Sequence, residues 1–123
     1  MVTKRTKSTR VKITRPIPGA PLDITTRDAE GRTPLHVAAF FGYVETVHKM
    51  LLQLADVHAR DAGERTPGHW PAYKGHLEVM TLLLESGADV NARDTGGRTL
   101  LRMAIIGRQA AMEALLRVHG AEL

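Results

Sequence analysis

The sequence repeats itself at a fixed interval of 33 residues. Residues 28–36 read DAEGRTPLH, residues 61–69 read DAGERTPGH, and residues 94–102 read DTGGRTLLR. Between residues 28–60 and 61–93, 15 of 33 positions are identical, which is far above chance. A constant period in this range is typical of stacked supersecondary units that bury their apolar faces only against one another. We therefore expect a solenoid rather than a closed globule.

Each unit carries the same signals for two short helices. Thr33, Thr66 and Thr99 stand where a helix N-cap belongs, and a proline follows the first two of them. Gly42 and Gly75 indicate the reversal into a second helix, whose apolar residues recur at helical spacing. We expect the first helices near 34–41, 67–74 and 100–107, and the second helices near 44–53, 77–86 and 109–118.

The segments GRTPLHVAA at 31–39 and GHLEVMTLLLESGADVNA at 75–92 resemble the ankyrin repeat. The resemblance implies an all-α ankyrin-repeat solenoid of stacked antiparallel helix pairs, with β-turn-like loops and a concave face. It also implies non-catalytic protein–protein interaction as the function. We take residues 1–22 as a basic N-terminal arm, extended or disordered, and 23–123 as the ankyrin-repeat domain, with repeats at about 28–60, 61–93 and 94–123.

The first two repeats depart from this pattern at positions that matter for stability. Gly68 replaces the Leu35-type core residue, and Pro71 falls inside the expected first helix. An interior proline costs about 3 kcal/mol and an interior glycine about 1 kcal/mol. Leu54 stands where Gly87 closes the second repeat, so it must adopt the left-handed conformation at a cost or reshape that end. We therefore expect a marginally stable fold.

Two turns also lack a glycine at the usual position. Glu64 replaces the glycine that the other repeats have as Gly31 and Gly97, and its neighbour Gly63 is a candidate to rescue the turn. In the third repeat, Gly107 comes one residue early.

The ends of the stack keep apolar residues, in 103–106 and 110–118, that would normally meet another repeat. Two solutions remain open. The arm covers one end with Val11, Ile13, Ile17 and Leu22, or the protein self-associates.

All five aromatic residues lie between residues 40 and 73. By resemblance, Phe40, Phe41, Tyr73 and Lys74 end the first helices on the concave face, where ankyrin proteins vary residues to contact partners. Three such rings packed together would form an interface anchor, although packing between repeats is the alternative. Trp70 occupies the interior position of Val37, so we expect it in the core. The predicted partner-binding residues are Phe40, Phe41, Tyr73, Lys74, Glu30, Arg32, Arg65 and Arg98.

Arginines recur along the turns and the extended stretches. Together with the turn-tip arginines, Arg60 and Arg93 would give a basic groove for an acidic partner. In the resembling family, however, basic residues at these places are ordinary, so the alternative is that the pattern carries no partner specificity.

The sequence offers no metal, cofactor or catalytic site. There is no cysteine and no His-Glu-x-x-His motif, and Ser8 and Ser86, the only serines, have no visible base beside them. By resemblance, His36 and His69 tie the turns by hydrogen bonds. The remaining histidines look like surface residues, namely His48, His58, His76 and His119.

The net charge of +4 conceals a basic arm on a mildly acidic body. Such an arm has three possible interpretations. It makes salt-sensitive contact with nucleic acid or an anionic surface, it is a localisation signal, or it is a plain solvated tail. Its basic residues are Lys4, Arg5, Lys7, Arg10, Lys12 and Arg15, with no acid among residues 1–22. The lack of cysteine and of a membrane-spanning apolar run fits an intracellular protein, cytoplasmic or nuclear.

Overall fold

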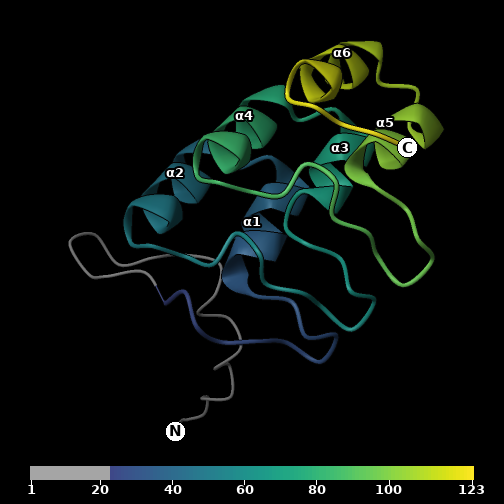
Figure 1. Ribbon diagram of the computed structural model, residues 1–123. Coiled ribbons are helices and arrows are strands. Elements are labelled where there is room, and N and C mark those ends of the chain that lie inside the picture. Colours follow the sequence, from purple (N-terminus) through teal and green to yellow (C-terminus); the bar gives the residue numbers. More distant parts are fainter. Residues whose placement is uncertain (1–22) are drawn as a thin grey trace, which may run out of the picture.

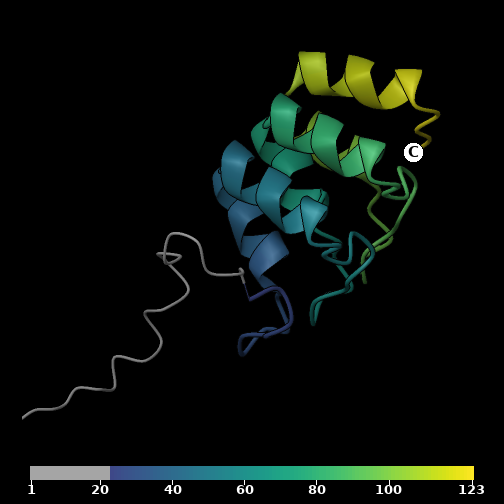
Figure 2. The ribbon, with the colours of Figure 1, turned by 90° about the vertical axis from the view of Figure 1, so that its left-hand side faces the viewer.

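The computed structural model describes residues 23–123, in which all regular structure is helical. The helices form three antiparallel pairs that stack side by side, with α1, α3 and α5 in one layer and α2, α4 and α6 in the other (Figure 1). Figure 2 shows the turn loops projecting from one side of this stack. The helices are α1 (Pro34–Phe41), α2 (Val44–Leu52), α3 (His69–Lys74), α4 (Leu77–Glu85), α5 (Leu100–Ile106) and α6 (Ala110–Val118). The expected all-α solenoid is confirmed.

The expected arm, with its six basic residues and its four candidate covering residues, lies outside the described residues. The described chain begins with an extended stretch, 23–27, that leads into the first turn.

Threonine caps begin α1 and α5, as the sequence predicts. The hydroxyl of Thr33 accepts a hydrogen bond from the N–H of His36, and the imidazole of His36 accepts one from the N–H of Thr33. The hydroxyl of Thr99 accepts from the N–H of Arg102 at 3.1 Å. Each cap satisfies helix N–H groups that otherwise have no partner, a contribution of about 1 kcal/mol.

The prediction that Thr66 caps the middle first helix is wrong. Helix α3 begins at His69, and its N-cap is Gly68, which makes no side-chain capping bond. Pro71 supplies the physical reason. It has no N–H, so the bond to the carbonyl of residue 67 that would start the helix there is impossible.

The late start of α3 also changes the expected cost of Pro71. In the first turn of a helix the N–H groups have no intrahelical partner, so the missing donor costs little there. The neighbours also compensate for Gly68. A Cβ atom at Gly68 would lie 3.3 Å from Leu100 and 3.7 Å from Met80, so these side chains occupy the space that a leucine would fill. Pro71 and Gly68 therefore reduce the stability of the middle repeat by less than the sequence predicts.

The core forms two clusters that bridge successive repeats. Each fully buried leucine, valine or methionine contributes about 1.5–3 kcal/mol, so the core outweighs the helix caps. The first cluster contains Leu35, Ala38, Ala39, Val47, Met50, Val57, Val79 and Leu83, and the second contains Ala72, Met80, Leu100, Met103, Ala104, Met112 and Leu116. Of the apolar residues expected to face outward in the third repeat, only some do. Ile105 and Ile106 are 37% and 52% exposed, whereas Met112 and Leu116 are buried.

Within residues 23–123, three non-glycine residues adopt positive φ, and each stands at a departure that the sequence shows. Leu54 has φ 66°, as expected for the closing position that Gly87 fills with φ 94°. Glu64 itself takes φ 63°, so the expected rescue by Gly63 is wrong. In the third repeat Arg108 stands at the position of Gly42 and Gly75 and adopts the left-handed conformation, with φ 58°. Gly107, one residue earlier, is right-handed. Gly107 is needed for another reason, because a Cβ atom there would collide with the carbonyl oxygen of Tyr73.

We predict that Leu54→Gly raises the free energy of unfolding by about 1 kcal/mol, because glycine adopts the left-handed conformation without a steric cost. The side chain of Leu54 is 87% exposed, so its removal sacrifices little burial. Urea denaturation followed by circular dichroism measures the change. The reciprocal variant Gly87→Leu, at a position with nothing within 4 Å of a new Cβ atom, should be destabilised. An unchanged or lower stability for Leu54→Gly would contradict the argument.

Candidate functional site

The five aromatic side chains form one continuous row of ring contacts, which we name the aromatic strip: Tyr43, Phe41, Phe40, Trp70 and Tyr73. Phe41 stacks on Tyr43 at 5.5 Å between ring centroids and meets Phe40 edge to face at 5.0 Å. Trp70 joins the two repeats, with edge-to-face contacts to Phe40 at 6.1 Å and to Tyr73 at 5.6 Å. These are the geometries that aromatic pairs prefer, so the rings hold one another in place.

The strip is partly exposed. Of the three rings expected to anchor a partner, Phe41 and Tyr73 are 52% and 38% exposed, and Phe40 is half-buried. Tyr43 adds a further exposed ring, at 56%. A large part of the aromatic surface is therefore accessible.

The prediction that Trp70 belongs to the core is wrong in part. One side of the indole packs against the second core cluster, but the residue is only half-buried. The indole is much larger than the valine at the equivalent position, so it extends from the core into the strip. Among the described residues its Nε1–H has no hydrogen-bond partner.

Sequence reasoning missed Tyr43 and Trp70 as members of this surface. Phe41 and Tyr43 flank Gly42, whose left-handed conformation (φ 75°) reverses the chain between α1 and α2. Two aromatic residues on either side of such a reversal are brought together, and this signal could have identified Tyr43.

Two cations lie over rings of the strip. The Nζ atom of Lys74 lies 4.3 Å from the centroid of Phe40, and the guanidinium carbon of Arg65 lies 5.5 Å from that of Trp70. Each contact falls within the range of cation–π attraction. Lys74 thus brings a positive charge onto the strip from the neighbouring repeat.

The predicted turn-tip residues are engaged within their own turns. The Nε atoms of Arg32, Arg65 and Arg98 lie 2.8, 3.2 and 3.0 Å from the carboxylates four residues earlier, those of Asp28, Asp61 and Asp94. Glu30 lies 3.0 Å from the Nη2 atom of Arg32. Of these residues, Arg65 also contacts the strip, through Trp70.

Each turn is built around its aspartate. One oxygen of Asp61 accepts hydrogen bonds from the N–H groups of Gly63 and Arg65, both at 2.9 Å. Burial by itself raises the pKa of this carboxyl, but the backbone and guanidinium hydrogen bonds of Arg65 outweigh it and hold the pKa below its usual value. The equivalent bonds act on Asp28 and Asp94. The aspartates are therefore structural anions.

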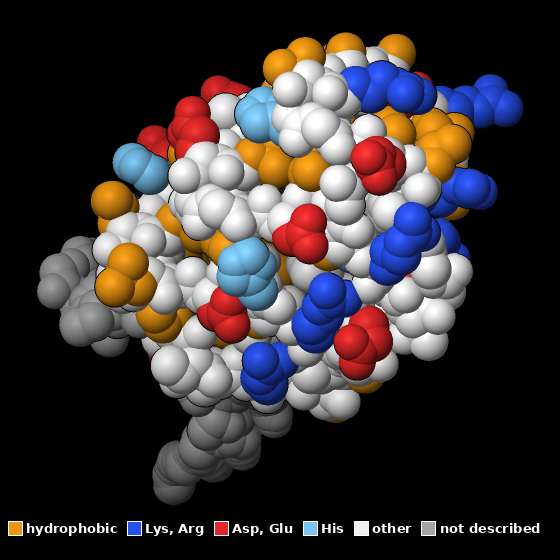
Figure 3. All heavy atoms as spheres, in the orientation of Figure 1, with side chains coloured by type: hydrophobic (Ala, Val, Ile, Leu, Met, Phe, Trp, Pro, Cys, Tyr) orange, Lys and Arg blue, Asp and Glu red, His pale blue; other side chains and the backbone are white. Residues whose placement is uncertain are grey.

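A second set of arginines connects successive repeats. The Nη1 atom of Arg60 donates to the carbonyls of Glu64 and Arg93, and Arg27 donates likewise to those of Gly31 and Arg60. These bonds give Arg60 a structural role. Figure 3 shows acidic side chains interspersed with the Lys and Arg side chains on the face that it displays, so that face has mixed charge.

His36 and His69 tie the turns by hydrogen bonds, as predicted. The Nδ1 atom of His36 accepts from the N–H of Thr33 at 3.1 Å, so Nε2 carries the proton and donates to the carbonyl of Arg65 at 2.8 Å. His69 makes the same pair of bonds with Thr66 and Arg98. Each imidazole thereby connects one repeat to the next.

The prediction that His76 is a surface residue needs correction. It is half-buried, and its Nε2 atom lies 3.2 Å from the carbonyl oxygen of Phe40. Gln109, at the equivalent position, donates to the carbonyl of Tyr73 at the same distance. His48, His58 and His119 are exposed.

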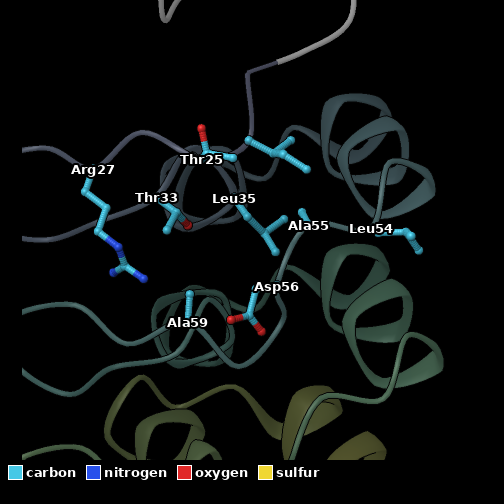
Figure 4. A pocket seen from close by; sticks show the side chains of 9 residues that line it. Thr25, Arg27, Thr33, Leu35, Leu54, Ala55, Asp56 and Ala59 are labelled. Atoms are coloured by element: carbon cyan, nitrogen blue, oxygen red, sulfur yellow. The ribbon is translucent and has the colours of Figure 1, made fainter.

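The described residues offer no enclosed pocket for chemistry. The best-formed hollow, of about 240 Å³, lies between the stretches 23–27 and 54–59 (Figure 4). Its lining mixes apolar side chains such as Leu35 and Leu54 with Arg27 and Asp56, and the guanidinium of Arg27 is engaged with backbone carbonyls. In the part of the chain that the structure describes, no three histidine or carboxylate groups gather as metal ligands would.

The comparison with known families agrees with this architecture. Residues 10–94 match the family model described as ankyrin repeats (3 copies), and the chain belongs to this family. Helices α5 and α6 lie beyond the matched range, yet they form the same kind of helix pair, and a threonine caps α5 as it does α1. No curated protein matches the sequence significantly. Ankyrin repeats are generally protein–protein interaction modules.

None of the helices within residues 23–123 has the length and apolar character needed to cross a bilayer.

We predict that the free energy of unfolding falls as the pH is lowered from about 7 towards 5. Burial lowers the pKa values of His36 and His69 below 6.5, and the bond that each accepts from threonine requires an unprotonated Nδ1 atom. Below pH 6.5 the unfolded chain therefore binds protons that the folded chain does not, and stability is lost. Urea denaturation across this range measures the slope.

The double variant His36→Gln/His69→Gln should be less stable and should lose most of this pH dependence. The variant His48→Gln, at an exposed position, should keep it. A slope that persists in the double variant would show that other groups cause it.

Proposed function

We propose that this protein is a non-catalytic module that binds a partner protein through the concave face, with the aromatic strip and Lys74 at the centre. Phe40, Tyr73 and Lys74 form the middle of the proposed site, together with Trp70. Phe41 lies at its edge, beside Tyr43. The turn-tip residues Glu30, Arg32, Arg65 and Arg98 form a polar rim.

The observation that carries the proposal is the continuity and exposure of the strip. Aromatic residues are enriched among the few side chains that dominate protein interfaces. A side chain already held by its neighbours loses little conformational freedom when a partner binds. The edge-to-face contacts of Trp70 with Phe40 and Tyr73 provide such restraint across two repeats.

The rim is expected to contribute less than the strip. Arg32 and Arg98 are 43% and 48% exposed and already paired with aspartates, so a partner carboxylate must share a guanidinium that is in use. Exposed ion pairs contribute about 0–1 kcal/mol. The rim would therefore orient a partner more than hold it.

We predict that Phe40→Ala/Tyr73→Ala abolishes capture of the partner while the helical circular dichroism stays unchanged. Truncation of a hot-spot side chain costs about 2 kcal/mol or more of binding free energy, so the pair should lose at least about thirtyfold in affinity. Affinity capture from a lysate of the source organism, with identification of the retained protein by mass spectrometry, provides the measurement.

The matched control is Leu52→Ala/Val118→Ala, which removes two side chains that are 69% and 81% exposed on α2 and α6. It should capture the same protein as the unchanged chain. Capture that survives the aromatic double variant would show that the partner binds elsewhere. Loss of the helical signal would show instead that these rings are needed for folding.

A further inference from the structure

The first-helix layer presents an apolar row that extends beyond the aromatic strip. Phe40, Tyr73 and Ile106 occupy equivalent positions in the three repeats, 33 residues apart. Each is the last or the second-last residue of its helix, and Tyr73 and Ile106 are 38% and 52% exposed. The row therefore runs along the stacking direction over all three repeats.

Two cations accompany this row. Lys74 ends α3, and Arg108 follows α5 in a left-handed conformation. Both are exposed, and neither forms an ion pair with the described residues. This distinguishes them from Arg32, Arg65 and Arg98, whose charges are balanced by aspartates in their own turns.

Carboxylates are scarce on the same side. Helices α1, α3 and α5 contain no acidic residue. The nearest acids along the chain, Glu45, Glu78 and Glu113, stand in the first turns of α2, α4 and α6, where a negative charge stabilises the helix N-terminus. None of them is paired with Lys74 or Arg108 in the described structure.

We propose that the partner is recognised through a peptide segment in which acidic residues flank apolar side chains. The apolar side chains pack on Phe40, Tyr73 and Ile106, and the carboxylates meet Lys74 and Arg108. Lys74 is already positioned, because its Nζ atom lies 4.3 Å from the centroid of Phe40. This inference rests on the proposed function and deepens it by naming the chemistry of the partner.

The test uses the full chain and three sets of short fluorescein-labelled peptides. The first set alternates Asp and Glu with Leu and Phe. The second replaces the acids with Asn and Gln, and the third replaces them with Lys and Arg. Fluorescence polarisation measures the dissociation constants at low and at high salt.

We expect the acidic set to bind about fivefold or more tightly than the neutral set at low salt, since two exposed ion pairs give a gain of this order. The difference in affinity between the acidic and neutral sets should become smaller at high salt, because salt screens the ion pairs. Lys74→Glu/Arg108→Glu should remove the preference for acidic peptides. Lys49→Glu/Arg117→Glu, which makes the same change of net charge at exposed sites on α2 and α6, should retain it.

Three results would overturn the inference: equal binding of the acidic and neutral sets, no binding of any set, or a preference that survives Lys74→Glu/Arg108→Glu. The last would assign the preference to other cations, such as those of residues 4–15, which this variant leaves intact.

Failure of this inference can be told apart from failure of the proposed function. If partner capture still requires Phe40 and Tyr73 while the peptides show no charge preference, only the chemistry named here is wrong. If Phe40→Ala/Tyr73→Ala affects neither partner capture nor peptide binding, the site itself is wrong.

Discussion

The contact between neighbouring repeats is the interaction on which the rest of this structure depends. A single helix pair is too small to enclose a core, and both core clusters include residues of two successive repeats. Polar groups reinforce the same junctions. His36 donates to the carbonyl of Arg65, Arg60 donates to that of Arg93, and the N–H of Ala62 donates to the carbonyl of Glu30. The same inter-repeat bonds recur with a period of 33 residues because the sequence does.

This dependence divides the residues of the repeats into two groups. The aspartates, arginines and histidines of the turns are occupied in holding repeats together, so their periodicity reflects the architecture. Some residues that break the period remain accessible for other contacts. Phe41 and Lys74 hold equivalent positions, share no chemistry and are exposed. The proposed recognition therefore depends on variable positions, whereas the constant ones hold the repeats in place.

The sequence allowed the helices, two threonine caps and the glycine reversals to be predicted, because each depends on residues close in the chain or on the period itself. The histidine bonds were implied by the resemblance to the ankyrin repeat. The errors arose where a distant group decides the outcome. Thr66 does not cap α3, because Pro71 makes that helix begin later, at His69. Trp70 is too large for the interior position that the alignment of the repeats assigns to it. Glu64 adopted the strained conformation itself because the turn requires it at that residue and not at Gly63. The candidate site was only partly predicted, since ring contacts between repeats such as that of Phe40 with Trp70 leave no signal in local sequence.

Gly107 determines how the third repeat packs against the second. A Cβ atom at this position would collide with the carbonyl oxygen of Tyr73, so the chain that leaves α5 lies directly against the end of α3. The equivalent positions of the first two repeats hold the exposed side chains of Phe41 and Lys74. The absence of a side chain at Gly107 therefore makes the junction between the last two repeats different from the junction between the first two.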